Sequence, residues 1–86
     1  MTKAEFTVGN KEKHIIIAEA TATFWRKLKV AVDGYETINT DWSKFSGGGT
    51  SFSVGEKEKH QVEVRVSGYF TPNISLLVDG KIEGKT

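Results

Sequence analysis

FTVGNKEKH at residues 6–14 returns as FSVGEKEKH at residues 52–60, and this repeated stretch decides how the chain folds. The offset of 46 residues persists to the end of each unit, where the Val-Asp-Gly of residues 32–34 matches that of residues 78–80. Such a repeat is typical of one supersecondary unit used twice. We therefore expect a single domain over residues 1–86, with repeat 1 at about 5–42, a glycine-rich connection at 46–49 and repeat 2 at about 50–84.

The segments between the glycines have the pattern of β-strands. Apolar and polar residues alternate, Val, Ile, Thr and Phe dominate, and no helical period appears. Gly9-Asn10 and its counterpart Gly55-Glu56 tolerate positive φ and so favour tight turns. Asp33-Gly34 and Asp79-Gly80 are strong hairpin signals. We expect eight strands, at about residues 5–8, 13–21, 27–32, 35–42, 50–54, 59–67, 74–78 and 81–83.

Period-two alternation separates a core face from a solvent face on each strand. In the sixth strand Val62, Val64 and Val66 share one face, and polar residues occupy the other. Trp42 is expected to close one end of the core. Two four-stranded units with one apolar face each can bury those faces only against each other. The prediction is an all-β fold, an eight-stranded antiparallel β-sandwich built from two four-stranded repeats, with a closed β-barrel as the alternative.

The composition narrows the classes of function. With 12 basic residues against 11 acidic ones, the chain has no global field for nucleic acid or an acidic membrane, so neither is an expected partner. Cysteine is absent, which removes disulfides, thiolate metal sites and cysteine nucleophiles. No apolar run approaches the roughly 20 residues that span a bilayer, and the first residues are not followed by the apolar core of a signal peptide. We expect a cytoplasmic protein.

Candidate catalytic and metal-binding residues are few. His14 and His60 match in the repeat and could approach each other as metal ligands, but the spacing identifies no further ligands. No acid stands beside either histidine at a motif spacing, and the Lys-Glu-Lys runs at 11–13 and 57–59 are typical of solvated turns. Each histidine opens a core-facing row, which favours a structural role. We predict no enzymatic activity, no catalytic residues, no cofactor and no metal.

The two copies differ at outward positions of the second strand. Ile15 and Ile17 stand where the second repeat has Gln61 and Glu63, and Leu77 is another apolar residue at an outward position. Two interpretations are open. Unequal wrapping of the sheets buries the isoleucines within the monomer, or they form a surface for a protein partner or for self-association. Contiguity of Leu77 with the isoleucines would favour the second interpretation.

Adjacent aromatic residues follow the second and sixth strands. Phe24 and Trp25 lie in one predicted loop, and Tyr69 and Phe70 lie in the other. Exposed rings give large contact area at low entropic cost, so Trp25 and Tyr69 are candidates for the interaction surface. The alternative function is a small-ligand or carbohydrate-binding site, in which the same two rings stack on sugars. The equivalence of Phe24 and Phe70 favours packing into the core for that pair.

The order and spacing of several short motifs resemble the N-terminal domain of the Fas apoptotic inhibitory molecule family. The resemblance covers most of the chain from His14 onward. The motifs are His14-Ile15-Ile16, Val32-Asp33-Gly34 followed by Glu36, Ile38 and Trp42, then Phe52-Ser53-Val54-Gly55, Gly68-Tyr69-Phe70, and Leu77-Val78-Asp79-Gly80-Lys81.

This resemblance implies an eight-stranded antiparallel β-sandwich in a cytosolic, non-enzymatic protein. It also implies a role in the regulation of apoptosis through protein interactions, with protection against aggregation as a further association. Two features depart from the family pattern: Phe6 stands where a tryptophan is expected, and these 86 residues do not include the family's second sandwich domain. We therefore expect either a single-domain relative or an excised domain. Activities that need that second domain are not carried over, and the family pattern contains no catalytic or ligand-binding residues to transfer.

Overall fold

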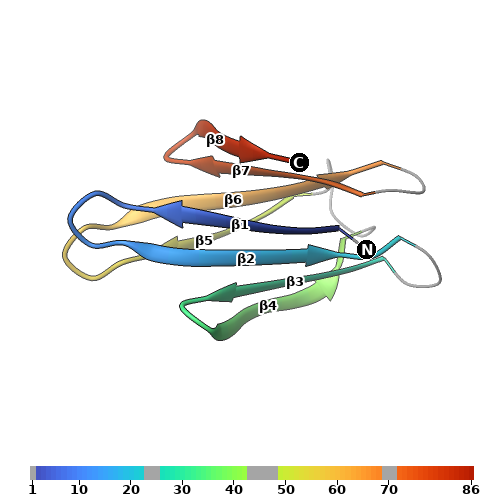
Figure 1. Cartoon of the computed structure of the whole chain (residues 1–86), viewed down its shortest axis with the longest axis horizontal. Coiled ribbons are helices and arrows are strands. Elements are labelled where there is room, and N and C mark those ends of the chain that lie inside the picture. The colour runs from blue at the N-terminus through green and yellow to red at the C-terminus, as the bar shows by residue number, and fades with distance from the viewer. Residues whose placement is uncertain (1, 23–25, 43–48, 69–71) are drawn as a thin grey trace.

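The computed structural model describes residues 2–22, 26–42, 49–68 and 72–86. They form two antiparallel four-stranded sheets, one in the order β1-β2-β3-β4 and the other in the order β5-β6-β7-β8 (Figure 1). The predicted β-sandwich of two four-stranded repeats is confirmed, and the strands do not close into a barrel. The strands are β1 (Thr2–Val8), β2 (His14–Ala20), β3 (Lys27–Val32), β4 (Tyr35–Asp41), β5 (Gly49–Val54), β6 (His60–Ser67), β7 (Asn73–Val78) and β8 (Lys81–Lys85).

The two sheets agree in local geometry as well as in strand order. Asp33 and Asp79 both have a φ of 52°, and each is followed by a glycine with positive φ. Positive φ at both central residues is the signature of the type I′ hairpin turn that Asp-Gly favours. The register of the last hairpin shifts between Val30 and Ala31 in one sheet and between Leu76 and Leu77 in the other, 46 residues along. One backbone unit is therefore used twice.

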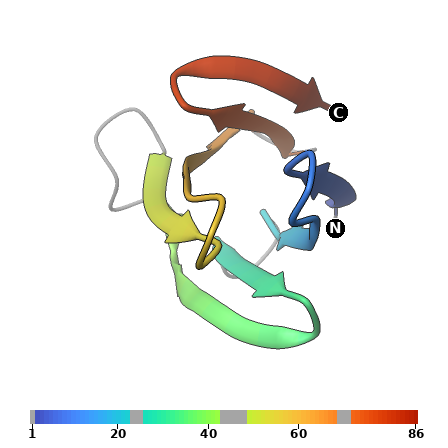
Figure 2. The same cartoon turned by 90° about the vertical axis from the view of Figure 1, so that its left-hand side faces the viewer.

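The core lies between the sheets, which curve around a shared interior when viewed along the long axis of the molecule (Figure 2). The predicted alternation is observed, because every second residue of the central strands is buried. The buried apolar residues are Val8, Ile16, Ala18, Ala20, Leu28, Val30, Trp42, Val54, Val62, Val64, Val66, Ile74, Leu76 and Val78.

Trp42 closes one end of this core, as its position at the end of the fourth strand predicts. Only 5% of its surface is exposed, and its indole nitrogen donates a hydrogen bond of 2.8 Å to the carbonyl of Thr21. The guanidinium of Arg26 lies 5.2 Å from the ring centroid, at cation–π distance. The ring thus buries its apolar body while its one polar atom keeps a partner.

The strand ends differ slightly from the predicted ones. β1 begins at Thr2, before the predicted start at about residue 5, because its first residue pairs with Ala20 and the whole of β2 has a partner. β8 continues to Lys85, which pairs with Ser75. Gly49, assigned to the connection, is the first residue of β5, whereas residues 46–48 lie outside the described part of the chain. In the described residues no helix has the length and apolarity needed to cross a membrane.

Candidate functional site

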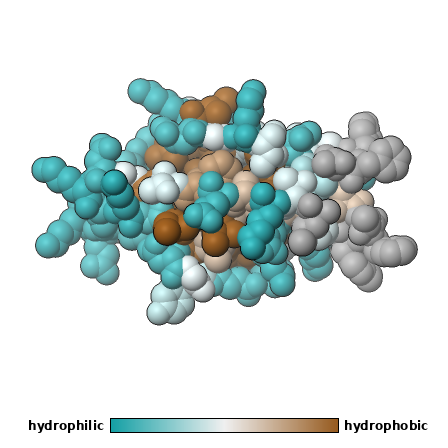
Figure 3. Space-filling model, in the orientation of Figure 1, coloured by the Kyte–Doolittle hydropathy of each residue, from teal (hydrophilic) through white to brown (hydrophobic). Residues whose placement is uncertain are grey.

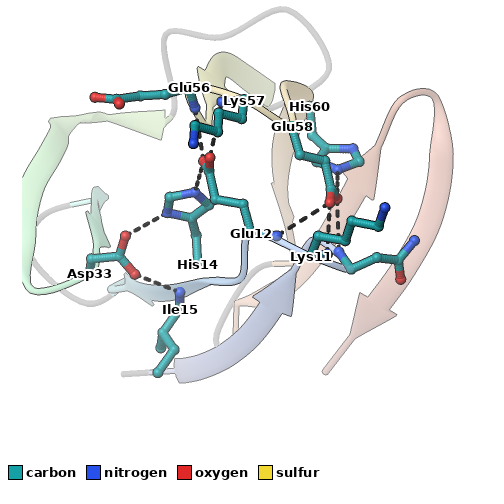
Figure 4. A network of polar contacts seen from close by, with 10 residues as sticks. Lys11, Glu12, His14, Ile15, Asp33, Glu56, Lys57, Glu58 and His60 are labelled. Atoms are coloured by element: carbon teal, nitrogen blue, oxygen red, sulfur yellow. Dashed lines mark hydrogen bonds and ion pairs between the residues drawn. The ribbon is translucent and has the colours of Figure 1, made fainter.

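The turns after β1 and β5, at residues 9–13 and 55–59, lie side by side at one end of the sandwich. A glutamate in each turn accepts hydrogen bonds from the backbone amides of the other turn (Figure 4). The carboxylate of Glu58 accepts hydrogen bonds from the backbone nitrogens of Asn10 and Lys11 at 2.8 Å each and of Glu12 at 3.3 Å. In return, the carboxylate of Glu12 accepts from the backbone nitrogens of Glu56 at 2.8 Å and Lys57 at 3.0 Å. Successive amides in such a turn form a concave anion site.

A histidine completes each half of this arrangement. The Nε2 atom of His14 lies 2.6 Å from Glu12, and its Nδ1 atom lies 2.6 Å from Asp33. His60 repeats these contacts with Glu58 at 2.5 Å and Asp79 at 2.7 Å. We call the six side chains the carboxylate clasp: Glu12, His14, Asp33, Glu58, His60 and Asp79.

The turns have the shape that the clasp needs because of their glycines. Gly9 and Gly55 have φ values of 110° and 98°, which side chains disfavour. A Cβ atom at Gly9 would overlap the carbonyl oxygen of Glu12, and one at Gly55 would overlap that of Glu58. The absence of a side chain lets each turn fold tightly back on itself, so that its amides converge on the carboxylate of the other repeat.

The aspartates extend the clasp to the β3–β4 and β7–β8 turns. While one oxygen of Asp33 contacts His14, the other accepts a hydrogen bond of 2.9 Å from the backbone nitrogen of Ile15. In the second repeat one oxygen of Asp79 contacts His60, and the other accepts a hydrogen bond of 2.9 Å from the backbone nitrogen of Gln61. Each histidine is thereby fixed between two turns and the start of its own strand.

Hydrogen bonding sets the charge state of the clasp. The imidazole of His14 and the amides of Lys57 and Glu56 lower the pKa of Glu12 to about 2, and His60 with the amides of the opposite turn does the same for Glu58. The hydrogen bonds that the His14 ring donates, first to Asp33 and then to Glu12, raise the pKa of His14 above its ordinary value of 6.5. Glu58 and then Asp79 raise the pKa of His60 in the same way.

The clasp was not predicted from the sequence. The lysines of the two Lys-Glu-Lys runs are exposed as expected, but the reading of both runs as wholly solvated turns is wrong for their glutamates, whose side chains are only 26% and 24% exposed. No acid lies at a catalytic motif spacing from either histidine, yet in the fold Glu12 and Asp33 both lie 2.6 Å from the ring of His14. A signal was present: the pattern Glu-Lys-His followed by Val-Asp-Gly is identical in both copies.

The histidines and glutamates of the clasp form hydrogen bonds within the clasp and with the turn amides. Both ring nitrogens of each histidine contact a carboxylate, and each glutamate also accepts backbone hydrogen bonds. Within the described ranges, no group of three or more His, Cys, Asp or Glu side chains could hold a metal ion. The geometry therefore makes the clasp a joint between the repeats, in agreement with the structural role predicted for the histidines.

A second candidate site is the outward face of β2. Ile15 is 46% exposed, and Ile17 is partly exposed. Ile17 is paired across the sheet with Glu5 on β1 and with Ala31 on β3. We call Ile15, Ile17 and Ala31 the β2 outer face. Brown, apolar side chains surrounded by teal, polar ones are visible over β2 in Figure 3.

Acidic side chains flank the β2 outer face on both sides. Glu5 lies on β1 and Glu36 lies on β4, across from Ala31. In the part of the chain that the structure describes, neither carboxylate has a lysine or arginine within 4.0 Å, whereas Glu19 pairs with Lys3 at 3.5 Å. A shallow hollow of about 200 Å³ adjoins this face, lined by Ile17, Glu19, Lys29, Val30, Ala31 and Glu36.

The other predicted surface residues do not join this face. Leu77 points outward from the opposite sheet, where it pairs with Glu63 and with Ile82. The structure therefore does not make Leu77 contiguous with the two isoleucines. Ile82 itself is 64% exposed and was not singled out from the sequence, although it lies beside the predicted Leu77. Trp25 and Tyr69, with the carbohydrate site that depends on them, lie outside the described residues.

No protein-family model, curated protein or solved structure matches the chain significantly.

Proposed function

We propose that the protein is a non-catalytic interaction module that binds a protein partner through its β2 outer face. The observation that supports this most directly is the exposure of Ile15, at 46%. The same fold position carries Gln61 in the second repeat, so the backbone unit does not require an apolar residue there. Ile15, Ile17 and Ala31 together form an apolar area with polar residues around it, and such an arrangement is typical of a contact surface.

The charges around the β2 outer face indicate which kind of partner surface would be complementary to it. Glu5 and Glu36 lie on either side of the apolar centre without a basic neighbour within 4.0 Å in the described ranges. A partner with apolar residues flanked by lysine or arginine complements this arrangement. A second copy of the chain would bring the same two acidic residues to the interface, so a different protein is the preferred partner and self-association is the weaker alternative.

The family resemblance is part of the same proposal. An eight-stranded sandwich is the architecture that the resemblance implies, and it is the architecture found here. Membership of the Fas apoptotic inhibitory molecule family, a role in regulating apoptosis, protection against aggregation and a cytoplasmic location are proposed on this basis.

Replacing Ile15 with Gln and Ile17 with Glu copies the second repeat onto the first. We expect this double variant to keep its fold, because the strand alternation is preserved, and to lose its partner in affinity capture and any self-association in sedimentation velocity. Ile82→Glu is the matched control, since it removes an exposed isoleucine from the opposite sheet. Unfolding of the double variant would show that the isoleucines belong to the core. Equal loss in the control would show that the β2 outer face has no special role.

A further inference from the structure

The carboxylate clasp is the polar connection between the two repeats at the turn end of the sandwich, and its bonds cross from one repeat to the other. Glu12 of repeat 1 holds the turn amides of Glu56 and Lys57, and Glu58 of repeat 2 holds those of Asn10 and Lys11. Each glutamate is in turn held by the histidine two residues later in its own repeat. A change in either histidine therefore reaches the turn of the opposite repeat.

The two carboxylate contacts of each histidine require a particular protonation state of the imidazole ring. A neutral imidazole has one N–H donor and one acceptor nitrogen, whereas an imidazolium has two donors. Both nitrogens of His14 lie 2.6 Å from a carboxylate oxygen, so both contacts are hydrogen bonds only if the ring carries two protons. The same holds for His60 at 2.5 and 2.7 Å. A neutral ring would set a nitrogen lone pair against a carboxylate and break one of the two contacts.

We propose that the carboxylate clasp is a pH-operated latch, which holds the two turns together while His14 and His60 are protonated and loosens them when these protons are lost. Loss of the proton toward Glu12 frees that glutamate from its own histidine and weakens its hold on Glu56 and Lys57. Loss at His60 acts on Asn10 and Lys11 in the same way. The bonds of the latch join the two repeats and need no partner at the β2 outer face, although Asp33 also accepts a hydrogen bond from the backbone nitrogen of Ile15.

The charged groups that surround the two histidines influence the pH at which the rings lose a proton. Glu12 and Asp33 face His14, and Glu58 and Asp79 face His60. Lys11 and Lys57 line the space between the two glutamates, and Lys81 and Glu83 line a hollow of about 280 Å³ beside His60.

The histidines lose their stabilising charge as pH rises, and the glutamates lose theirs as pH falls. The pKa of each histidine is raised on folding, so its contribution is complete below pH 6.5 and is lost as pH rises through the folded value. The pKa of each glutamate is lowered to about 2, so its contribution is complete above pH 4.5 and is lost only as pH falls toward 2. The stability that the latch contributes is therefore complete between about pH 4.5 and 6.5. In the folded protein the latch opens on the alkaline side, as pH rises through the raised pKa values of the two histidines.

Nuclear magnetic resonance can follow the latch in the wild-type protein. Titration of the imidazole nitrogens should give midpoints above 6.5 for both histidines. The amide resonances of Asn10, Lys11, Glu56 and Lys57 should shift together with them, since these amides are held by the glutamates. Midpoints at or below 6.5, or amide shifts that do not follow the histidine titration, would overturn the proposal.

Glu12→Gln tests the crosswise coupling, because it removes the charge but keeps an oxygen that can accept hydrogen bonds. We expect a lower midpoint for His14, shifts of the Glu56 and Lys57 amides in the opposite repeat, and little change at His60. Glu58→Gln should give the mirrored pattern at residues 10 and 11. Glu56→Gln is the matched control for Glu58→Gln, with the amides of Asn10 and Lys11 as the readout: it removes a carboxylate from the same turn, but Glu56 enters the clasp only through its backbone. Equal effects in the control would contradict the latch.

Discussion

Leu76→Ala should lower the free energy of unfolding by about 2–4 kcal/mol. Leu76 is fully buried in the middle of β7, where it pairs with Val64 on β6 and with Gly84 on β8. Truncation removes apolar contacts from both sheets and leaves a cavity that the twisted strands can close only in part. A loss of this size is a large share of the stability that a domain of 86 residues holds. Urea denaturation followed by tryptophan fluorescence measures it.

Leu77→Ala is the matched control for this prediction. The two leucines are adjacent in the chain, but Leu77 points outward and is partly exposed. Its truncation should cost less than about 1 kcal/mol, the range typical of surface substitutions. A larger loss for Leu77 than for Leu76 would mean that the faces of β7 are assigned the wrong way round.

Gly55→Ala should lower the free energy of unfolding by about 2–3 kcal/mol, because two penalties act together. Gly55 has a φ of 98°, and a Cβ atom there would overlap the backbone carbonyl of Glu58. The turn must therefore open, which also displaces the amides of Glu56 and Lys57 from Glu12. Thermal and urea denaturation of the variant give the change.

Gly80→Ala separates the cost of backbone strain at positive φ from the cost of overlap between a Cβ atom and the backbone. Gly80 has a φ of 85°, but a Cβ atom there would meet nothing within 4 Å. Backbone strain alone should cost about 1–2 kcal/mol. If both alanine variants lose the same stability, the close approach at Gly55 has no energetic weight and the turn is less tightly built than it appears in the structure.

Sequence patterns could predict the architecture because its determinants are local. The alternation of Val62, Val64 and Val66 with polar residues defines both faces of β6, and the two Asp-Gly pairs define their hairpins through the conformations that these residues allow. The internal repeat then predicts the same arrangement for the other half. Local signals also placed Ile15 and Ile17 on the outward side of β2, where the structure has them.

The bonds of the clasp that cross between the repeats could not be predicted in this way, because they join residues far apart in the chain. Glu12 meets the turn of Glu56 and Lys57 only after both sheets have formed and packed. Alternation says which way a side chain points from its own strand, but not which ends of two sheets come together. For the same reason, the separation of Leu77 from the β2 outer face emerges only when the two sheets are placed.

The comparison between repeats separates the positions that the shared backbone unit keeps identical from those that it allows to differ. The six clasp residues and the first glycine of each turn are identical in both copies: Gly9 and Gly55, Glu12 and Glu58, His14 and His60, and Asp33 and Asp79. The outward residues differ instead, with Ile15, Ile17 and Glu36 replaced by Gln61, Glu63 and Ile82. A backbone unit that works with either set leaves these positions open to selection by a binding partner.

The central claim is that the protein binds its partner through the β2 outer face, and methyl spectra of the isoleucines test it most directly. Protein labelled at isoleucine δ1-methyl groups would be compared in buffer and in cell lysate. We predict that the signals of Ile15 and Ile17 broaden or shift in lysate, while those of exposed Ile82 and buried Ile16 are unchanged. Unchanged signals for Ile15 and Ile17, or equal broadening of Ile82, would contradict the claim.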